Sequence, residues 1–276
     1  MSSLHAYYTE RLKDRPAGVI FLGVMNFVLI SALVLWTLGG LILFPVAFIF
    51  LKFIPRRTTP WITRLAIWVY GRVWQAFTRI FVTFEPVQYL PAQFSTPGII
   101  VVNHRSFFDT YCMNMLPVYD VCFAVRDWPF KIPVYSIFMK MAAYINIEKF
   151  SWEQSVARSK QTLDKKGFVL FFPEGHRSRT RAMTRFYSGA FKMAVETNTP
   201  IIPVCLTGTE DLLPPGRRYM APARIKMRVL NPVFPDEFTG EMGHQALRKK
   251  VKELMEDELL SMDADKNRHL QAKSLF

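Results

Sequence analysis

Polar side chains suited to proton transfer follow an apolar segment at residues 98–102. His104 comes just after this segment, and Asp109 follows five residues later. A carboxylate beside an imidazole can fix its tautomer, which leaves the other ring nitrogen to take a proton from a hydroxyl group. Positions i and i+5 of a straight helix lie about 140° apart, so this pairing requires a turn or the start of a helix. On spacing alone, a solvated loop histidine is the alternative.

A second polar cluster follows the apolar residues 167–172. It holds Glu174, Gly175 and His176, together with arginines at positions 177, 179, 181 and 185. Several guanidinium groups beside a glycine at the end of a strand favour a cradle for phosphate or carboxylate. A basic loop that touches anionic lipid without specificity is the alternative.

Strands alternate with helices in the part of the chain that carries these clusters. Apolar segments predict strands at 98–102, 121–125, 167–172, 201–206 and 224–230, and helices are predicted at 151–166, 189–197 and 243–261. This alternation predicts an α/β fold with a mostly parallel or mixed sheet that helices cover on both faces. Chemistry in such folds sits at the carboxyl ends of the strands, which is where both polar clusters fall.

The amino-terminal residues have a membrane-like composition. Residues 16–51 contain no charged side chain, and about 20 apolar residues suffice for a helix to cross a bilayer. Gly39, Gly40 and Pro45 are expected points for a break. Basic residues on both flanks favour a re-entrant or tightly bent helical pair with both ends on the cytoplasmic side, while a single crossing stays open; these residues are Arg11, Lys13, Arg15, Lys52, Arg56 and Arg57.

The next segment, residues 61–82, predicts an amphipathic helix. One arc of its helical wheel is polar and holds Thr63, Arg64, Gly71, Arg72, Gln75, Thr78 and Arg79. A narrow face with arginine opposite Trp and Phe is typical of a helix in a headgroup layer; packing on the soluble domain is the alternative. We therefore predict membrane-anchoring helices in residues 1–82 and an α/β domain in residues 83–276, with residues 264–276 as a polar tail that frays.

Composition narrows the functional classes. The 276 residues are 50% hydrophobic, which excludes disordered, collagen-like and coiled-coil proteins, and the net charge of +13 favours an anionic partner. No nucleic-acid recognition motif accompanies that charge, so we expect no nucleic-acid partner. Cys112, Cys122 and Cys205 form no CxxC pair, which argues against a disulfide framework or a cysteine-rich zinc site and favours a reducing compartment.

Taken in order, these features resemble a known family. Asn103-His104 with Asp109 is followed by Phe172-Pro173-Glu174-Gly175 with Arg177-Ser178-Arg179, then by Phe186, Gly189 and Ala190, and then by Pro203 in an apolar strand. This order resembles the glycerophospholipid acyltransferases, and the 1-acyl-sn-glycerol-3-phosphate (lysophosphatidate) acyltransferases in particular. The resemblance extends over residues 84–230.

The resemblance implies roles for individual residues. His104 would be the catalytic base and Asp109 its partner. Glu174 and Gly175 would line the acceptor site, and Arg177 would bind the acceptor phosphate. The family's second motif matches residues 143–149, where Lys149 replaces an arginine as an acceptor contact and Glu148 replaces an aspartate.

The implied activity is transfer of an acyl chain from acyl-CoA or acyl-acyl carrier protein to the free hydroxyl of a lysophospholipid. Lysophosphatidate is the expected acceptor and phosphatidate the product, with no cofactor or metal beyond the thioester co-substrate. Expected partners are membrane lipids, the lysophospholipid and the thioester donor, including acyl carrier protein. We expect a membrane location, the bacterial inner membrane, with the catalytic domain on the cytoplasmic face.

Further cations fit this interpretation. Arg224, Lys226 and Arg228 alternate with apolar residues and so share one face of a strand. With Arg179, we expect them to contact the acyl donor or anionic lipid; a solvated strand face is the alternative. Three other functions stay open: an acyltransferase for another lysolipid, a hydrolase that binds metal through His104, Asp109, Glu174 and His176, and a non-catalytic basic membrane adaptor.

Overall fold

The computed structural model describes residues 16–178 and 182–274. Within these residues, seven strands form one mixed sheet in the order β1-β7-β6-β2-β5-β3-β4. Every neighbouring pair is parallel except β6 and β7, which are antiparallel. The strands are β1 (Val82–Phe84), β2 (Ile99–Val102), β3 (Val121–Val125), β4 (Ile145–Asn146), β5 (Phe168–Phe171), β6 (Ile201–Thr207) and β7 (Ala223–Val229). The five predicted strands therefore end within one residue of their expected limits, and the predicted α/β class is confirmed.

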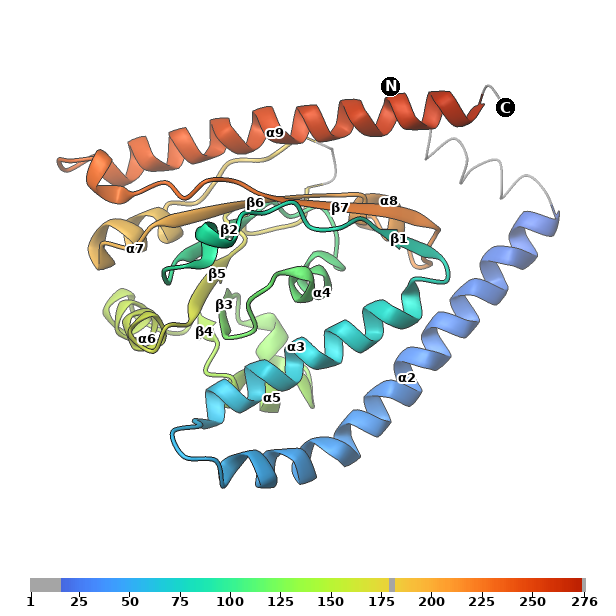
Figure 1. Ribbon diagram of the computed structural model, residues 1–276, viewed down its shortest axis with the longest axis horizontal. Coiled ribbons are helices and arrows are strands. Elements are labelled where there is room, and N and C mark those ends of the chain that lie inside the picture. Colours follow the sequence, from blue (N-terminus) through green and yellow to red (C-terminus); the bar gives the residue numbers. More distant parts are fainter. Residues whose placement is uncertain (1–15, 179–181, 275–276) are drawn as a thin grey trace.

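Helices cover both faces of this sheet (Figure 1). The longer ones are α2 (Pro16–Lys52), α3 (Thr59–Thr78), α5 (Tyr135–Met141), α6 (Trp152–Asp164), α7 (Gly189–Thr197) and α9 (Gly243–Ser274). The short ones are α4 (Asp109–Cys112), α8 (Thr209–Leu212), η1 (Pro91–Phe94), η2 (Met113–Met115), η3 (Trp128–Lys131) and η4 (Pro235–Glu237). Alternate residues of β2 enter two separate cores: Ile100 and Val102 pack toward α2, α3 and α4, whereas Ile99 and Val101 pack toward α6, α7 and α9.

The apolar amino-terminal segment is one continuous helix. Gly39, Gly40 and Pro45 all lie inside α2, so the predicted break is wrong. The helix instead bends in its second half without interruption (Figure 1), as expected where a proline removes one hydrogen bond from the helix ladder. In the described part of the chain, α2 is the one helix long and apolar enough to cross a membrane. Arg11, Lys13 and Arg15, the predicted basic flank, lie outside the described residues.

The first half of α2 is tied to the α/β domain. The Asn26 side-chain amide accepts a hydrogen bond from the Met220 backbone N–H at 2.7 Å and donates one to the Met220 carbonyl at 2.9 Å. Leu22, Met25 and Leu29 enter the core on this side. Because most other side chains of α2 are exposed and apolar, the helix presents a long apolar surface outside this contact.

Helix α3 has its polar arc toward the protein interior. Thr63, Arg64, Gly71, Gln75 and Thr78 are buried, while Val69 and Phe77 on other sides are each more than 40% exposed. The predicted headgroup contact through this arc is therefore wrong for most of its members, although Arg72 and Arg79 are exposed. The alternative of packing on the domain is the one observed. Most of the side chains that α3 buries are polar, whereas a surface helix of a soluble protein usually buries apolar ones.

Arg64 joins α3 to three distant parts of the domain. Its guanidinium forms an ion pair with Asp120 at 2.8 Å and donates hydrogen bonds to the Ala142 carbonyl at 2.8 Å and the Thr162 hydroxyl at 3.4 Å. The side chain is only 5% exposed. A buried charge of this kind is tolerated because its hydrogen-bond donors are satisfied.

We expect Arg64→Ala to lower the free energy of unfolding by about 3–5 kcal/mol, since it leaves the Asp120 carboxylate without its partner. Chemical denaturation in a fixed detergent measures this loss. Arg72→Ala is the matched control, because Arg72 is exposed and stacks on Trp68 with its guanidinium 4.5 Å from the ring centre; its loss should stay below about 1 kcal/mol. Equal losses for the two variants would contradict the role given to Arg64.

Helix α9 is longer than its sequence indicates. The sequence predicts its end at residue 261, whereas the helix continues to Ser274, so the predicted end is wrong; Leu275 and Phe276 of the predicted polar tail lie outside the described residues. Carboxylates on its later turns meet buried or half-buried arginines of the domain: Asp263 contacts Arg105 at 3.3 Å, and Asp265 contacts Arg228 at the same distance. These tertiary ion pairs favour helix in a segment whose own composition is polar.

Candidate active site

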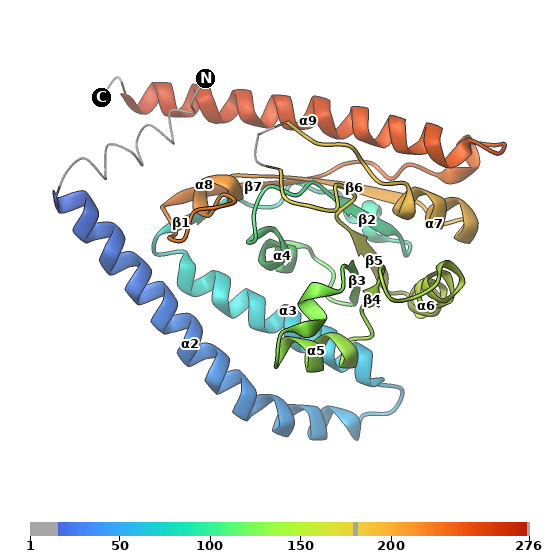
Figure 2. The ribbon, with the colours of Figure 1, turned by 180° about the vertical axis from the view of Figure 1, so that it is seen from behind.

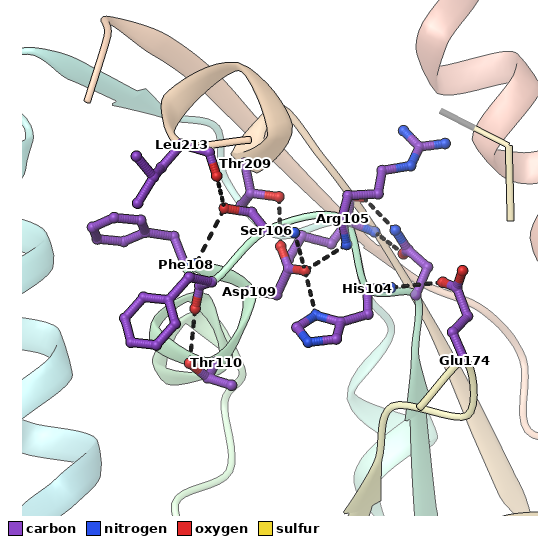
Figure 3. Close-up of polar contacts among 12 residues, drawn as sticks. His104, Arg105, Ser106, Phe108, Asp109, Thr110, Glu174, Thr209 and Leu213 are labelled. Atoms are coloured by element: carbon purple, nitrogen blue, oxygen red, sulfur yellow. Dashed lines mark hydrogen bonds and ion pairs between the residues drawn. The ribbon is translucent and has the colours of Figure 1, made fainter. Parts of the chain in front are cut away.

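His104 and Asp109 meet at the carboxyl end of β2. The loop after this strand turns back on itself, and Asp109 is the first residue of α4. The Nδ1 atom of His104 lies 2.8 Å from Oδ2 of Asp109 (Figure 3). The predicted contact is confirmed, and it uses the helix start that the five-residue spacing requires.

The Asp109 carboxylate is buried and accepts several hydrogen bonds. Its Oδ2 atom accepts from the backbone N–H groups of Arg105 at 2.7 Å and Ser106 at 2.8 Å, and its Oδ1 accepts from the Thr209 hydroxyl at 2.5 Å (Figure 3). A carboxylate that only accepts requires the hydrogen of His104 to be on Nδ1. The Nε2 atom of a neutral His104 is then an acceptor, able to take a proton.

Thr209 is a site residue that was not predicted. It follows β6 and begins α8, and β6 lies beside β2 in parallel register. The carboxyl ends of both strands therefore meet, which brings together two residues 100 positions apart. The available signal in the sequence was a Gly-Thr pair directly after an apolar strand, which becomes informative once the strand order is known.

Glu174 has a different position from the one implied. Its side chain is fully buried and accepts from the His104 backbone N–H at 2.8 Å, and from the backbone N–H and hydroxyl of Thr184, each at 2.8 Å. It holds the loop after β5 against the His104 loop (Figure 3). These contacts hold the backbone of His104 in position, and the implied lining of the acceptor site by Glu174 stays a prediction.

The rest of this loop carries Gly175 and Arg177 and contacts His104 through Ser178. Gly175 has φ +70°, and a Cβ atom there would lie 2.8 Å from the ring of Tyr187, so the position suits glycine. The backbone N–H of Ser178 donates to the His104 carbonyl at 2.8 Å, and Arg177 just before it is exposed. Arg179 lies outside the described residues.

Lys149 lies apart from the residues around His104. It follows β4 at the far end of the sheet and lines a cavity of about 800 Å³. Of the described residues, the lining set of that cavity does not include His104, Glu174 or Arg177. Glu148 beside it accepts from Nε of Arg126 at 2.7 Å and from the Asp127 backbone N–H at 2.8 Å.

Arg224, Lys226 and Arg228 share one face of β7, as the alternation predicts. Each is paired within the chain: Arg224 and Lys226 contact Glu85 at 2.9 and 3.5 Å, and Arg228 contacts Glu258 of α9 at 2.5 Å. The face thus takes part in ion pairs within the chain, and the expected donor or lipid contact stays a prediction.

The other side chains that could act as nucleophiles are Ser106 and the three cysteines. The Ser106 hydroxyl is buried, donates to the Leu213 carbonyl at 2.7 Å and accepts from the Phe108 N–H at 3.2 Å. Burial raises the pKa of all three thiols, Cys112, Cys122 and Cys205. The four residues considered as metal ligands form no metal-binding group in the described part of the chain, because Glu174 and Asp109 turn toward backbone N–H groups.

Comparisons with known proteins identify similar sequences. The Acyltransferase family matches residues 81–207. A chloroplastic 1-acyl-sn-glycerol-3-phosphate acyltransferase of Arabidopsis thaliana is 31% identical over 138 residues, 49% of this chain and 38% of the relative. The alpha enzyme of that name from Mus musculus is 32% identical over 155 residues, 52% of this chain and 53% of the relative. The chain spans about half the length of the curated relatives that it matches.

A solved structure shares the fold. The crystal structure of the 1-acyl-sn-glycerophosphate acyltransferase PlsC from Thermotoga maritima superposes with a TM-score of 0.70 at 21% identity, over 88% of this chain and 98% of the other. The family match covers β1 to β6, and with them the His104–Asp109 pair and the loop of Glu174. Residues 81–207 thus match an acyltransferase domain, and the chain shares the fold of this solved acyltransferase structure.

Proposed function

We propose that this protein transfers an acyl chain from a thioester donor to the free hydroxyl of lysophosphatidate, giving phosphatidate. The observation that carries the proposal is the buried Asp109 carboxylate on Nδ1 of His104 at 2.8 Å. It leaves Nε2 as the proton acceptor. The names of the relatives, which are 1-acyl-sn-glycerol-3-phosphate acyltransferases, support this choice of acceptor.

The reaction needs one proton to move twice. Nε2 of His104 takes the hydroxyl proton while the oxygen attacks the thioester carbonyl, and Asp109 stabilises the imidazolium that forms. When the tetrahedral intermediate collapses, the carbon–sulfur bond breaks and the imidazolium returns the proton to the thiolate. Products are the new oxygen ester and a free thiol, so no covalent enzyme intermediate is required.

We assign the binding of the acceptor phosphate to Arg177. In lysophosphatidate the phosphorus lies roughly four bonds of about 1.5 Å from the free hydroxyl oxygen, a reach of about 5 Å. The backbone next to Arg177 contacts the His104 carbonyl at 2.8 Å through Ser178, and the exposed guanidinium can supply a bidentate contact.

We expect Arg177→Ala to raise KM for lysophosphatidate about tenfold or more, since a charge-assisted contact is lost. A neutral monoacylglycerol acceptor should lose little, because it has no phosphate. Acyl transfer to both acceptors by the purified variant measures the difference. Equal losses on the two acceptors would indicate a structural role for Arg177 instead.

We further propose that α2 and α3 hold the protein on a membrane, with the bacterial inner membrane and its cytoplasmic face as the expected site. Support comes from the exposed apolar side chains of α2 and the outward apolar side of α3. Helix α3 contacts α4, which begins at Asp109. A lysolipid in the bilayer would therefore lie close to the His104–Asp109 pair.

The test is acyl transfer by the purified protein in detergent or in vesicles. Phosphatidate formation and thiol release are followed with acyl-CoA and with acyl-acyl carrier protein, with and without lysophosphatidate. The proposal expects thiol release that depends on the lysolipid and that survives a chelator. Equal thiol release without lysolipid would indicate a thioesterase, and no turnover with either donor would argue for a non-catalytic adaptor.

A further inference from the structure

Two separate loops hold the Asp109 carboxylate. The loop after β2 donates the backbone N–H groups of Arg105 and Ser106 to Oδ2, at 2.7 and 2.8 Å, and the Thr209 hydroxyl after β6 donates to Oδ1 at 2.5 Å. Groups in a reaction site need positions fixed to a fraction of an ångström by their surroundings. A contact that joins the two loops therefore also fixes where the carboxylate meets Nδ1 of His104.

The Arg105 side chain joins these two loops. Its guanidinium is only 3% exposed and lies 3.6 Å from the carboxylate of Glu210, the residue directly after Thr209. Glu210 also accepts from the Gly208 backbone N–H at 2.8 Å, which holds it at the start of α8. The Arg105 side chain leaves its loop on the side away from Asp109 (Figure 3). Any effect of this side chain on the reaction therefore passes through the backbone.

Helix α9 supplies a further carboxylate to this guanidinium. Oδ2 of Asp263 accepts a hydrogen bond from Nη1 of Arg105 at 3.3 Å. The helix runs along the sheet and contacts β6 (Figures 1 and 2). Its buried apolar side chains recur every three or four residues and form one stripe; they are Leu247, Val251, Met255, Leu259 and Met262. Asp263 follows the last of these, so its carboxylate lies on a turn that the core anchors.

We propose that Asp263 is a positioning residue: through Arg105 it holds the two loops around Asp109, and so keeps that carboxylate on Nδ1 of His104. The inference rests on the acyl-transfer function proposed above. It assigns a role in the reaction to α9, which lies outside residues 81–207, the part of the chain that the Acyltransferase family matches. The physical reason is that a buried guanidinium needs its anionic partners. When one is lost, the side chain moves toward other acceptors and its loop moves with it.

Asp263→Asn tests this role in the full-length protein, because it removes the charge and keeps an oxygen that accepts a hydrogen bond. We expect kcat to fall about tenfold, since a displacement of about 1 Å in the site can cost a factor of about 100. KM for lysophosphatidate and for the thioester donor should stay within about twofold of the wild type. Asp263→Glu, which keeps the charge, should retain more activity than Asp263→Asn.

Asp265→Asn is the matched control. Asp265 lies on the same helix and contacts Arg228 of β7 at 3.3 Å, the distance at which Asp263 contacts Arg105. Arg228 keeps its second partner, Glu258, in this variant. The control therefore removes an ion pair between α9 and the sheet without touching the loops around Asp109, and it should keep the kcat of the wild type.

Backbone amide exchange measures the effect without turnover. The N–H groups of Arg105 and Ser106 bond to Asp109, so they exchange with solvent when this loop opens. Asp263→Asn should raise the exchange rate of the peptide with residues 103–110 about tenfold, and Asp265→Asn should leave it unchanged. A wild type that transfers no acyl chain, together with this difference in exchange, would refute the acyl-transfer proposal and support the link from Asp263 to the loop.

A double variant separates positioning from a loss of stability. With Asp109→Asn already present, Asp263→Asn should lower kcat by less than about twofold further, because its effect passes through the Asp109 carboxylate. Thermal unfolding confirms that each variant is folded at the assay temperature. Four results would overturn the proposal: wild-type kcat in Asp263→Asn, an equal loss in Asp265→Asn, unchanged exchange of residues 103–110, and a full further loss of about tenfold in the double variant.

Discussion

We expect His104→Ala to lower kcat by a factor of about 10² to 10⁴, the usual contribution of a general base. The loss should appear with every acceptor and donor, because the imidazole acts on the hydroxyl proton and not on a headgroup. The His104 ring is only 17% exposed and stacks near Phe172 at 4.4 Å between ring centres. The alanine variant should still fold, since the backbone N–H that bonds Glu174 is retained. Phosphatidate formation under saturating substrates measures the effect.

His176→Ala is the matched control for this experiment. His176 is an exposed histidine in the loop after β5, and its removal should change kcat by less than about threefold. Thermal unfolding followed by circular dichroism separates lost chemistry from lost structure. Near-normal turnover in the His104 variant would remove this residue from the mechanism.

Asp109→Asn should reduce kcat by a similar factor, about 10² or more, for a different reason. The carboxylate fixes the His104 proton on Nδ1 and stabilises the imidazolium during the reaction. An asparagine amide can present a hydrogen to Nδ1, which favours the wrong tautomer and leaves Nε2 protonated. The asparagine NH2 group would also face the N–H groups of Arg105 and Ser106 and the hydroxyl of Thr209, which all donate to the carboxylate in the wild type. Turnover of the purified variant across pH measures the result.

A double variant tests whether the two residues act as a unit. With His104 already replaced by alanine, Asp109→Asn should cause little further loss, because its effect passes through the imidazole. Thr209→Val is a milder companion that removes one hydrogen bond to the carboxylate and should cost less than Asp109→Asn. Fully multiplicative losses in the double variant would mean that Asp109 acts independently of His104.

Local patterns predicted most elements of the fold. Helix α7 ends at Asn198, whose left-handed backbone (φ +46°) is a common helix stop, and its predicted limits match. Helix α6, predicted over 151–166, begins with a capping box in which Ser151 and Gln154 exchange reciprocal hydrogen bonds. Such helix limits can be predicted from the sequence because they depend only on residues that are close together in the chain.

Contacts between distant residues were harder to predict. A helical wheel separates the polar and apolar sides of α3 but does not say which side meets protein. The hydrogen-bond partners of Arg64 are Asp120, Ala142 and Thr162, which lie 56, 78 and 98 residues away in the sequence. Likewise, the place of Glu174 in a motif predicts a carboxylate in the site. The three hydrogen bonds that it accepts depend on how the His104 loop and Thr184 fold around it. The pairing of His104 with Asp109 was accessible because only five residues separate them.

The inward polar side of α3 has a practical consequence for recombinant work. Deleting residues before β1 in order to obtain a water-soluble fragment would take away the guanidinium that neutralises Asp120 and bonds the Ala142 carbonyl. The fragment would expose these groups together with the apolar floor around Leu116 and Met113. Surfactant or nanodisc preparations of the intact polypeptide are therefore the appropriate material for crystallisation and enzymology.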